Sequence, residues 1–166
     1  MLENYILSVS NAELKIFILS MLPITELRFS IPYGYFVLDT PLWIASGISI
    51  LGNITIGYIT LSIIGPIMSS IQKISFFSFI IKKIFIITRR KSDIIDRLKI
   101  IGLLFFIGIP MPFTGVWTGS LGAYLFGLNR NKSILAIIGG VLLSSFIVSI
   151  ICYGSKEMLL YFNIII

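Results

Sequence analysis

Glu26 and Arg28 are two opposite charges in the stretch PITELRFSIPYGYF, which lies between two long apolar segments. A charge at membrane depth is costly and normally faces protein, water or a partner charge, so such a pair indicates function. Beside Arg28 the Glu26 carboxyl stays ionised, whereas in apolar surroundings its pKa rises and it can carry a proton. The pair predicts a proton relay, an anion site or both. A static ion pair that only fixes the loop is the structural alternative.

The composition is that of an all-α integral membrane protein. Of the 166 residues, 57% are hydrophobic and only 12% are charged, with a mean hydropathy of +1.03. Soluble domains carry about 25% charged residues. The length predicts a single membrane domain over residues 1–166 with only a few crossings. The first residues lack a basic region of the secretory type, so we expect them to stay in the mature protein.

Several kinds of chemistry have no residues to support them. Cys152 is the only cysteine and histidine is absent, so the sequence predicts no metal site and no cofactor. No combination of nucleophile, base and orienting group can be assembled, so we expect no enzyme. The predicted partners are the lipid bilayer and a small-molecule or lipid substrate, with a homodimer as a further alternative. Nucleic acid is not among them.

The net charge of +6 is concentrated in one connection. It lies between Ile71 and Lys99, while the rest of the chain sums to zero. Phenylalanine and isoleucine are mixed with lysine from Ile71 to Ile87, which predicts an amphipathic helix on the membrane surface. A new helix is expected to begin at Ser92 or Asp93. The positive-inside rule places the basic connection 71–99 in the cytoplasm of a multi-pass cell-membrane protein.

Two segments are long and apolar enough to cross the bilayer: Leu42 to Met68 and Ser133 to Tyr153. Both carry small and hydroxyl residues at helical spacing, which let helices approach closely in lipid. In the first segment these residues are Ser46, Ser49, Asn53 and Gly57, and in the second they are Gly140, Ser144, Ser145 and Ser149. Asn53 is predicted either to border the charged stretch or to serve packing alone.

Prolines predict a break in front of each crossing. Pro23 and Pro32 frame the charged stretch, and a helix that began near Pro23 would hold Pro32 in its interior. We therefore expect a non-helical dip here. Residues up to Asn11 are predicted as an interfacial piece and Ala12 to Leu22 as a short half-helix, with one full crossing as the alternative.

A second break is predicted at Pro110 and Pro112, with Gly115 and Gly119 as further structural breaks. Thr114 is well placed to cap a new helix from Gly115, and Arg130 follows closely. A crossing would put Arg130 outside, against the positive-inside bias, whereas a re-entrant hairpin returns it to the cytoplasm. The hairpin is the less costly interpretation.

The two halves share one plan, which predicts an inverted repeat. Half 1 covers about residues 12–70 and half 2 about 94–154, with the connection 71–93 between them. Each half has a short helix, a break, a hydroxyl cap (Ser30 or Thr114), a second short helix and a span. One crossing separates them, so the copies have opposite orientation and both termini lie outside. Broken helices of inverted repeats meet at the midplane in transporters, where their N-termini and Arg28 favour an anion.

Two motifs carry a family resemblance: MLPITELRFSIPYGY, followed by LGN at Leu51 to Asn53, and IPMPFTGVWTGSLGAYLFGLNRNK. From about Ala12 to Tyr153 the chain resembles the small multi-drug export protein family, which is in turn similar to the DedA/VTT (SNARE-associated) superfamily. The resemblance implies paired re-entrant hairpins and a membrane transporter. Its signature positions match Glu26, Arg28, Pro32, Pro110, Pro112, Thr114, Gly115, Trp117 and Gly119. Phe29 and Ser30 depart from the pattern, since relatives more often have small residues there.

Three functions follow as alternatives. The first is a transporter of the small multi-drug export type, with proton coupling through Glu26. The second is a DedA-like lipid flippase or scramblase, and the third is a membrane scaffold that transports nothing. The substrate and proton residues are expected among Glu26, Arg28, Ser30, Asn53, Thr114 and Trp117. A four-span small multidrug resistance transporter fits less well, because there the membrane glutamate lies in an unbroken helix.

Overall fold

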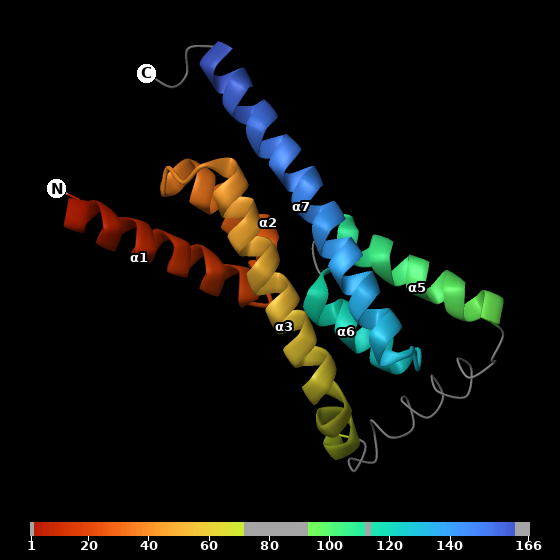
Figure 1. The fold of residues 1–166 in the computed structure, drawn as a ribbon. Coiled ribbons are helices and arrows are strands. Elements are labelled where there is room, and N and C mark those ends of the chain that lie inside the picture. Colours follow the sequence, from red (N-terminus) through yellow and green to blue (C-terminus); the bar gives the residue numbers. More distant parts are fainter. Residues whose placement is uncertain (1, 72–92, 112–113, 162–166) are drawn as a thin grey trace. The chain divides into compact units, whose positions relative to one another are not determined.

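The computed structural model describes residues 2–71, 93–111 and 114–161, and every element in these ranges is a helix (Figure 1). In chain order they are α1 (Leu2–Met21), α2 (Glu26–Pro32), the π-helix η1 (Tyr33–Val37), α3 (Leu42–Ile71), α5 (Asp93–Gly108), α6 (Val116–Leu125) and α7 (Arg130–Tyr161). The all-α prediction is confirmed for this part of the chain. The predicted amphipathic surface helix and Pro112 lie outside it.

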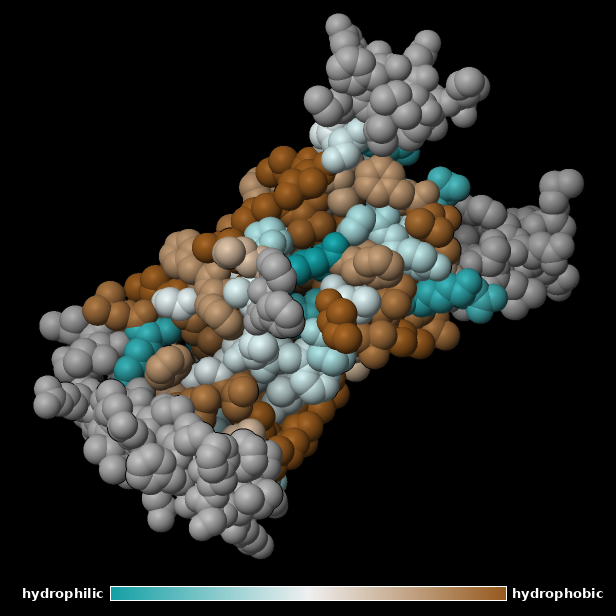
Figure 2. Space-filling view, turned by 180° about the vertical axis from the view of Figure 1, so that it is seen from behind, coloured by the Kyte–Doolittle hydropathy of each residue, from teal (hydrophilic) through white to brown (hydrophobic). Residues whose placement is uncertain are grey.

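Two helices are long and apolar enough to cross a membrane: α3 over Leu42–Met68 and α7 over Arg130–Lys156. Both were predicted, and α7 begins and ends beyond the predicted limits. By contrast α5 has 16 residues and α6 has 10, and a crossing takes about 20. Hydrophobic residues cover much of the described surface seen in Figure 2, and the hydrophilic residues are gathered in a few places.

The chain forms two compact units whose boundaries fall inside α3 and α7. Unit 1 comprises Met1–Asn53 and Leu142–Ile166, and unit 2 comprises Ile54–Val141. The core of unit 1 is built from Ile16, Leu27, Ile31, Ala45, Val148 and Cys152. The core of unit 2 is built from Ile56, Leu103, Ile107, Val116, Ala123, Ala136, Ile137 and Val141.

In unit 1, α1 and α2 contact one another and α1 also lies directly against α3. A Cβ on Gly52 would meet the Ser20 hydroxyl and would lie 2.9 Å from the Phe17 carbonyl oxygen. A Cβ on Gly34 would lie 2.7 Å from the end of the Ile16 side chain. Because the Phe17 carbonyl oxygen is part of the backbone of α1, glycine at position 52 sets how closely α1 approaches α3.

Unit 2 uses the same device. α5 and α6 contact one another, and a Cβ on Gly140 of α7 would lie 2.8 Å from the Leu104 carbonyl oxygen of α5. Gly119, predicted as a structural break, is instead a buried residue in the interior of α6, where a Cβ would lie 2.7 Å from Ile107. That prediction was wrong, because close helix packing and not a turn requires the glycine.

Residues with a positive φ also occur in pairs in the described part of the chain. Thr25 and Thr114 each precede a residue of positive φ at a helix start, Glu26 (φ 46°) and Gly115 (φ 158°). A second pair, Asp39 (φ 50°) and Gly127 (φ 61°), lies before α3 and before α7. The number of residues from Glu26 to Gly115 is almost the same as the number from Asp39 to Gly127. Each half therefore repeats one sequence of helix, break, short helix and long helix.

The division of the N-terminal segment into an interfacial piece and a half-helix was wrong. α1 is one helix of 20 residues that ends at Met21, two residues before Pro23. Glu13 is partly exposed and Lys15 is exposed. Both are good helix formers whose charges can face outward, so they do not interrupt the helix.

The predicted non-helical dip was too long. Only the short link 22–25 is non-helical, and the chain is helical from Glu26 to Val37. Pro32 is the last residue of α2, where the chain changes to the π-helix η1. The Leu38 N–H donates to the Tyr33 carbonyl five residues earlier. A wider turn accommodates the missing donor of proline without ending the helix.

Gly115→Ala is expected to destabilise the protein by about 1–3 kcal/mol, because its φ of 158° and ψ of −167° form a region that essentially only glycine adopts. Thermal unfolding in detergent measures the effect. Gly102→Ala in α5 is the control, since a Cβ there meets no atom within 4 Å. Equal unfolding midpoints for the two variants would contradict the assigned turn.

Candidate functional site

Glu26 is the first residue of α2 and is buried, with 6% of its surface exposed. Its φ of 46° is in the left-handed region, which costs a residue with a side chain about 1–2 kcal/mol. The Glu26 N–H donates to the Leu22 carbonyl across the break at 3.1 Å. At the corresponding point of the second half the chain has Gly115, whose φ of 158° is also positive and which, as a glycine, carries no such cost. The carboxylate is therefore held in place at the expense of backbone strain.

Arg28 lies two residues further along α2, is partly buried and interacts electrostatically with Glu26. The proton relay and the anion site predicted for these two charges stay predictions. Both side chains make further interactions in the structure.

Hydroxyl and amide groups connect α1, α2 and α3 beside this pair. The Ser30 hydroxyl of α2 and the Ser49 hydroxyl of α3 are 2.7 Å apart and share a hydrogen bond. The Asn53 side-chain N–H donates to the Ser20 carbonyl at 2.8 Å, near the end of α1. We call Ser20, Glu26, Ser30, Ser49 and Asn53 the unit 1 polar cluster. All five are buried.

Ser30 was predicted to cap a helix that starts at Ile31, and this was wrong. It lies inside α2, which starts at Glu26 with Thr25 as its N-cap residue. The Thr25 hydroxyl donates to the Leu19 carbonyl and so ties the break to the end of α1. Ser30 is thereby free of the capping role and bonds to α3 instead.

The Asn53 side chain has one buried acceptor atom without a hydrogen-bond partner among the described residues. Asn53 is 0% exposed, its N–H group is used by carbonyls, and its Oδ1 has no hydrogen-bond partner among the described residues. The same holds for the Ser144 hydroxyl of α7, which also belongs to unit 1. A buried polar atom without a partner costs about 1–3 kcal/mol, so these positions can accept a donor from water or a ligand. The described residues contain no group of three acidic, histidine or cysteine side chains that could hold a metal.

The structure places the other predicted residues in unit 2. Thr114 was predicted to cap a helix from Gly115, but Gly115 is itself the N-cap residue of α6 and makes no side-chain bond. The Thr114 hydroxyl instead donates back to the carbonyls of Ile109 (3.0 Å) and Met111 (2.9 Å). Trp117 lies in the first turn of α6 and is partly buried. Pro110 follows the end of α5, as predicted.

The sequence profile described as Putative small multi-drug export protein matches residues 26–147. The chain belongs to this family. No curated protein and no solved structure matches it.

The small multi-drug export match begins at Glu26 and extends from α2 through most of α7. It includes Arg28, Ser30, Ser49 and Asn53 of the unit 1 polar cluster and its surroundings, and leaves α1 outside. Together with two helices of spanning length and composition, membership of this family identifies a membrane protein.

A groove of about 290 Å³ lies between α5 and α6 in unit 2. Its lining is almost wholly apolar and consists of Lys99, Gly102, Leu103, Phe106, Thr118, Gly122 and Phe126. All of its lining residues belong to unit 2. Its chemistry suits a hydrocarbon segment and not a polar solute.

Sequence reasoning missed Ser20 and Thr25. Ser20 is fully buried, its hydroxyl donates to the Phe17 carbonyl at 2.7 Å, and its carbonyl accepts from Asn53. A signal for Thr25 was present, since Thr-Glu at 25–26 and Thr-Gly at 114–115 occupy matching places in the two halves. For Ser20 no such signal exists, because serines are frequent throughout both halves.

Proposed function

We propose that the protein is a membrane transporter of the small multi-drug export type in which Glu26 binds the transported charge. The observation that carries the proposal is that Glu26 is buried and left-handed where the other half has glycine. Strained residues that persist in a fold concentrate at functional sites. A residue that served the turn alone would be replaced by glycine or asparagine at a gain in stability.

The proposed architecture is an inverted repeat of re-entrant hairpins. α5 and α6 are each too short to cross the bilayer, and they contact one another. The chain is therefore proposed to enter and leave the membrane on the same side in this hairpin. The matching positive-φ pairs and the matching close approaches at Gly52 and Gly140 support the same plan for α1 and α2. Non-helical backbone at membrane depth has to be buried in protein or line a wet cavity, which fits the two breaks.

With α3 and α7 as the two crossings, the proposed protein is multi-pass with both termini outside. The basic connection 71–99 is then cytoplasmic, following the positive-inside rule. The proposed partners are the bilayer and a small-molecule substrate, with a second copy of the chain as an additional partner. No enzymatic step and no cofactor enter the proposal.

The mechanism follows from one carboxylate in a low-dielectric setting. Glu26 can be neutralised by a proton or by a cationic substrate, and only one of them binds at a time. Arg28 competes for the same carboxylate, which keeps it ionised when neither ligand is bound. The free acceptor on Asn53 and the hydroxyls of Ser30 and Ser49 provide hydrogen bonds beside it. Exchange of proton for cation on Glu26 gives proton-coupled export.

Reconstituted vesicles test this function. A pH gradient is expected to drive the uptake or release of a fluorescent cationic drug, and dissipating the gradient with a protonophore is expected to stop it. Vesicles without protein give the leak. If the drug distributes at the leak rate with the gradient intact, the transporter proposal is wrong.

The second candidate is a DedA-like lipid flippase or scramblase, favoured by the apolar groove between α5 and α6. Dye-labelled phospholipid that moves between leaflets without a gradient, in the same vesicles, would support it over drug export. If drug and lipid both stay still in vesicles that hold folded protein, the third alternative, a scaffold, is left.

A further inference from the structure

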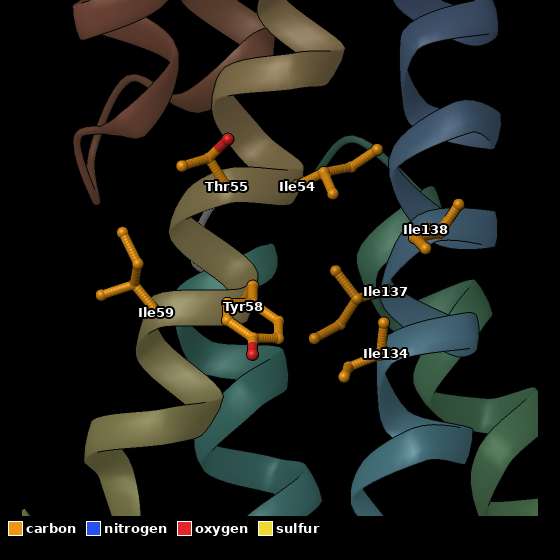
Figure 3. A pocket seen from close by; sticks show the side chains of 7 residues that line it. All are labelled: Ile54, Thr55, Tyr58, Ile59, Ile134, Ile137 and Ile138. Atoms are coloured by element: carbon orange, nitrogen blue, oxygen red, sulfur yellow. The ribbon is translucent and has the colours of Figure 1, made fainter.

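Unit 2 has a second groove, separate from Glu26, between α3 and α7. Its volume is about 310 Å³, and its lining is Ile54, Thr55, Tyr58, Ile59, Ile134, Ile137 and Ile138. Figure 3 shows Ile54 and Tyr58 from α3 and Ile134 and Ile137 from α7 on the two sides of the gap between the helices. The volume lies at the lower end of the range for ligand pockets.

The groove lies in an apolar environment. Both helices that form it have the length and composition to cross a membrane, so the neighbouring molecules are lipid acyl chains. Tyr58 is 56% exposed and Ile59 is also exposed, so the groove is open on one side. Five of its seven lining residues are isoleucine. A polar solute would lose its hydration there without replacement, whereas a hydrocarbon chain loses nothing.

A cation stands at one end of this groove. Arg130, the first residue of α7, donates from Nη2 to the Ser62 hydroxyl of α3 at 2.8 Å, and its Cζ lies 5.3 Å from the centre of the Tyr58 ring. Tyr58 and Ser62 are one turn apart on α3, and Ile134, Ile137 and Ile138 follow Arg130 on α7 at helical spacing. The groove therefore runs from a fixed guanidinium at the end of a span into isoleucines at greater depth.

This arrangement matches an anionic phospholipid in both of its parts. Ser62 takes one of the five N–H donors of the guanidinium, and the Tyr58 ring takes no hydrogen bond in the plane of the group, so donors are left for phosphate oxygens. An arginine at the end of a span lies at headgroup level. The cytoplasmic leaflet, where the basic segments are proposed to lie, is rich in anionic lipid. We propose that this groove binds one anionic phospholipid, with its phosphate on Arg130 and one acyl chain along the isoleucines.

Native mass spectrometry of the purified full chain in detergent tests this site with phosphatidylglycerol and with phosphatidylcholine of the same chain length. Phosphatidylglycerol is expected to bind about tenfold more tightly, and Arg130→Gln to remove that advantage. Lys132→Gln is the matched control, because it removes an exposed cation two residues away that does not line the groove. Equal losses for Arg130→Gln and Lys132→Gln would overturn the site and leave only general attraction to a basic surface.

Two tryptophan variants test whether an acyl chain lies along the isoleucines. Ile138→Trp fills the groove and is expected to weaken both lipids several-fold, whereas Leu135→Trp, at a position that is 67% exposed and outside the groove, is expected to weaken neither. Unchanged binding in Ile138→Trp would overturn the acyl assignment, and so would displacement of phosphatidylglycerol by a soluble phosphate monoester. Arg130→Lys keeps the charge and is expected to retain part of the preference for phosphatidylglycerol. Thermal unfolding of each variant separates lost binding from lost folding.

Discussion

Glu26→Gln is expected to reduce gradient-driven drug transport in vesicles to the leak rate while the protein still folds. Glutamine keeps the size of the buried side chain and one acceptor oxygen, and it removes the charge and the ability to take up a proton. Because Glu26 is only 6% exposed, we expect no ion from solvent to take the place of its charge. Drug flux at equal amounts of reconstituted protein measures the effect.

Glu26→Gly separates a functional carboxylate from a scaffolding one. Glycine relieves the left-handed backbone at φ 46° by about 1 kcal/mol, which offsets part of the attraction to Arg28 that is lost, so this variant is expected to fold and to transport nothing. Arg28→Ala is expected to stop transport too and to lower stability, because the buried Glu26 loses an oppositely charged partner. Transport at the parent rate in Glu26→Gln or in Glu26→Gly would reduce the charged pair to a structural feature.

Gly52→Ala is expected to have the largest effect on stability of any single methyl group in unit 1. The added Cβ meets the Ser20 hydroxyl and lies 2.9 Å from the Phe17 carbonyl oxygen, so α1 has to move away from α3. Overpacking costs about 1–3 kcal/mol when side chains can adjust, and a backbone obstacle places this variant at the upper end. Such a shift also breaks the bond from Asn53 to Ser20. Thermal unfolding and drug flux should fall together.

Gly140→Ala is the counterpart in unit 2, with the Leu104 carbonyl oxygen 2.8 Å from the added Cβ. The repeat predicts a similar loss of stability there. Gly47→Ala on α3 and Gly102→Ala on α5 are the controls, since neither Cβ meets an atom within 4 Å. If Gly52→Ala and Gly47→Ala unfold at the same temperature, α1 is not held against α3 as described.

The sequence predicted those features that depend on length, composition and strong local signals. The two long helices follow from unbroken apolar runs, and the end of α5 follows from Pro110. The small-residue face of α3 was predicted from helical spacing, and its members do contact other helices: Ser49 bonds to Ser30, and Asn53 to Ser20. Membership of the small multi-drug export family was also visible in the two motifs.

The predictions that failed concern positions where tertiary contacts override a local rule. Pro32 was expected to break a helix, but the chain stays helical there and changes to a π-turn at Tyr33. Ser30 and Thr114 were expected as caps from their residue type, yet Ser30 bonds to Ser49 of another helix and Thr114 bonds back to carbonyls of the break that precedes it. The strain at Glu26 could not be predicted, since φ at a helix start depends on where the break ends.

Cysteine accessibility at Asp39 and Asn129 tests the re-entrant inverted repeat most directly. Both residues are exposed and lie in the links before α3 and α7, and Cys152→Ala removes the buried native thiol. With a membrane-impermeant maleimide on intact cells, Asp39→Cys is expected to label at once and Asn129→Cys only after the membrane is opened. Labelling of both positions from the same side would contradict the proposed architecture and the transport mechanism built on it.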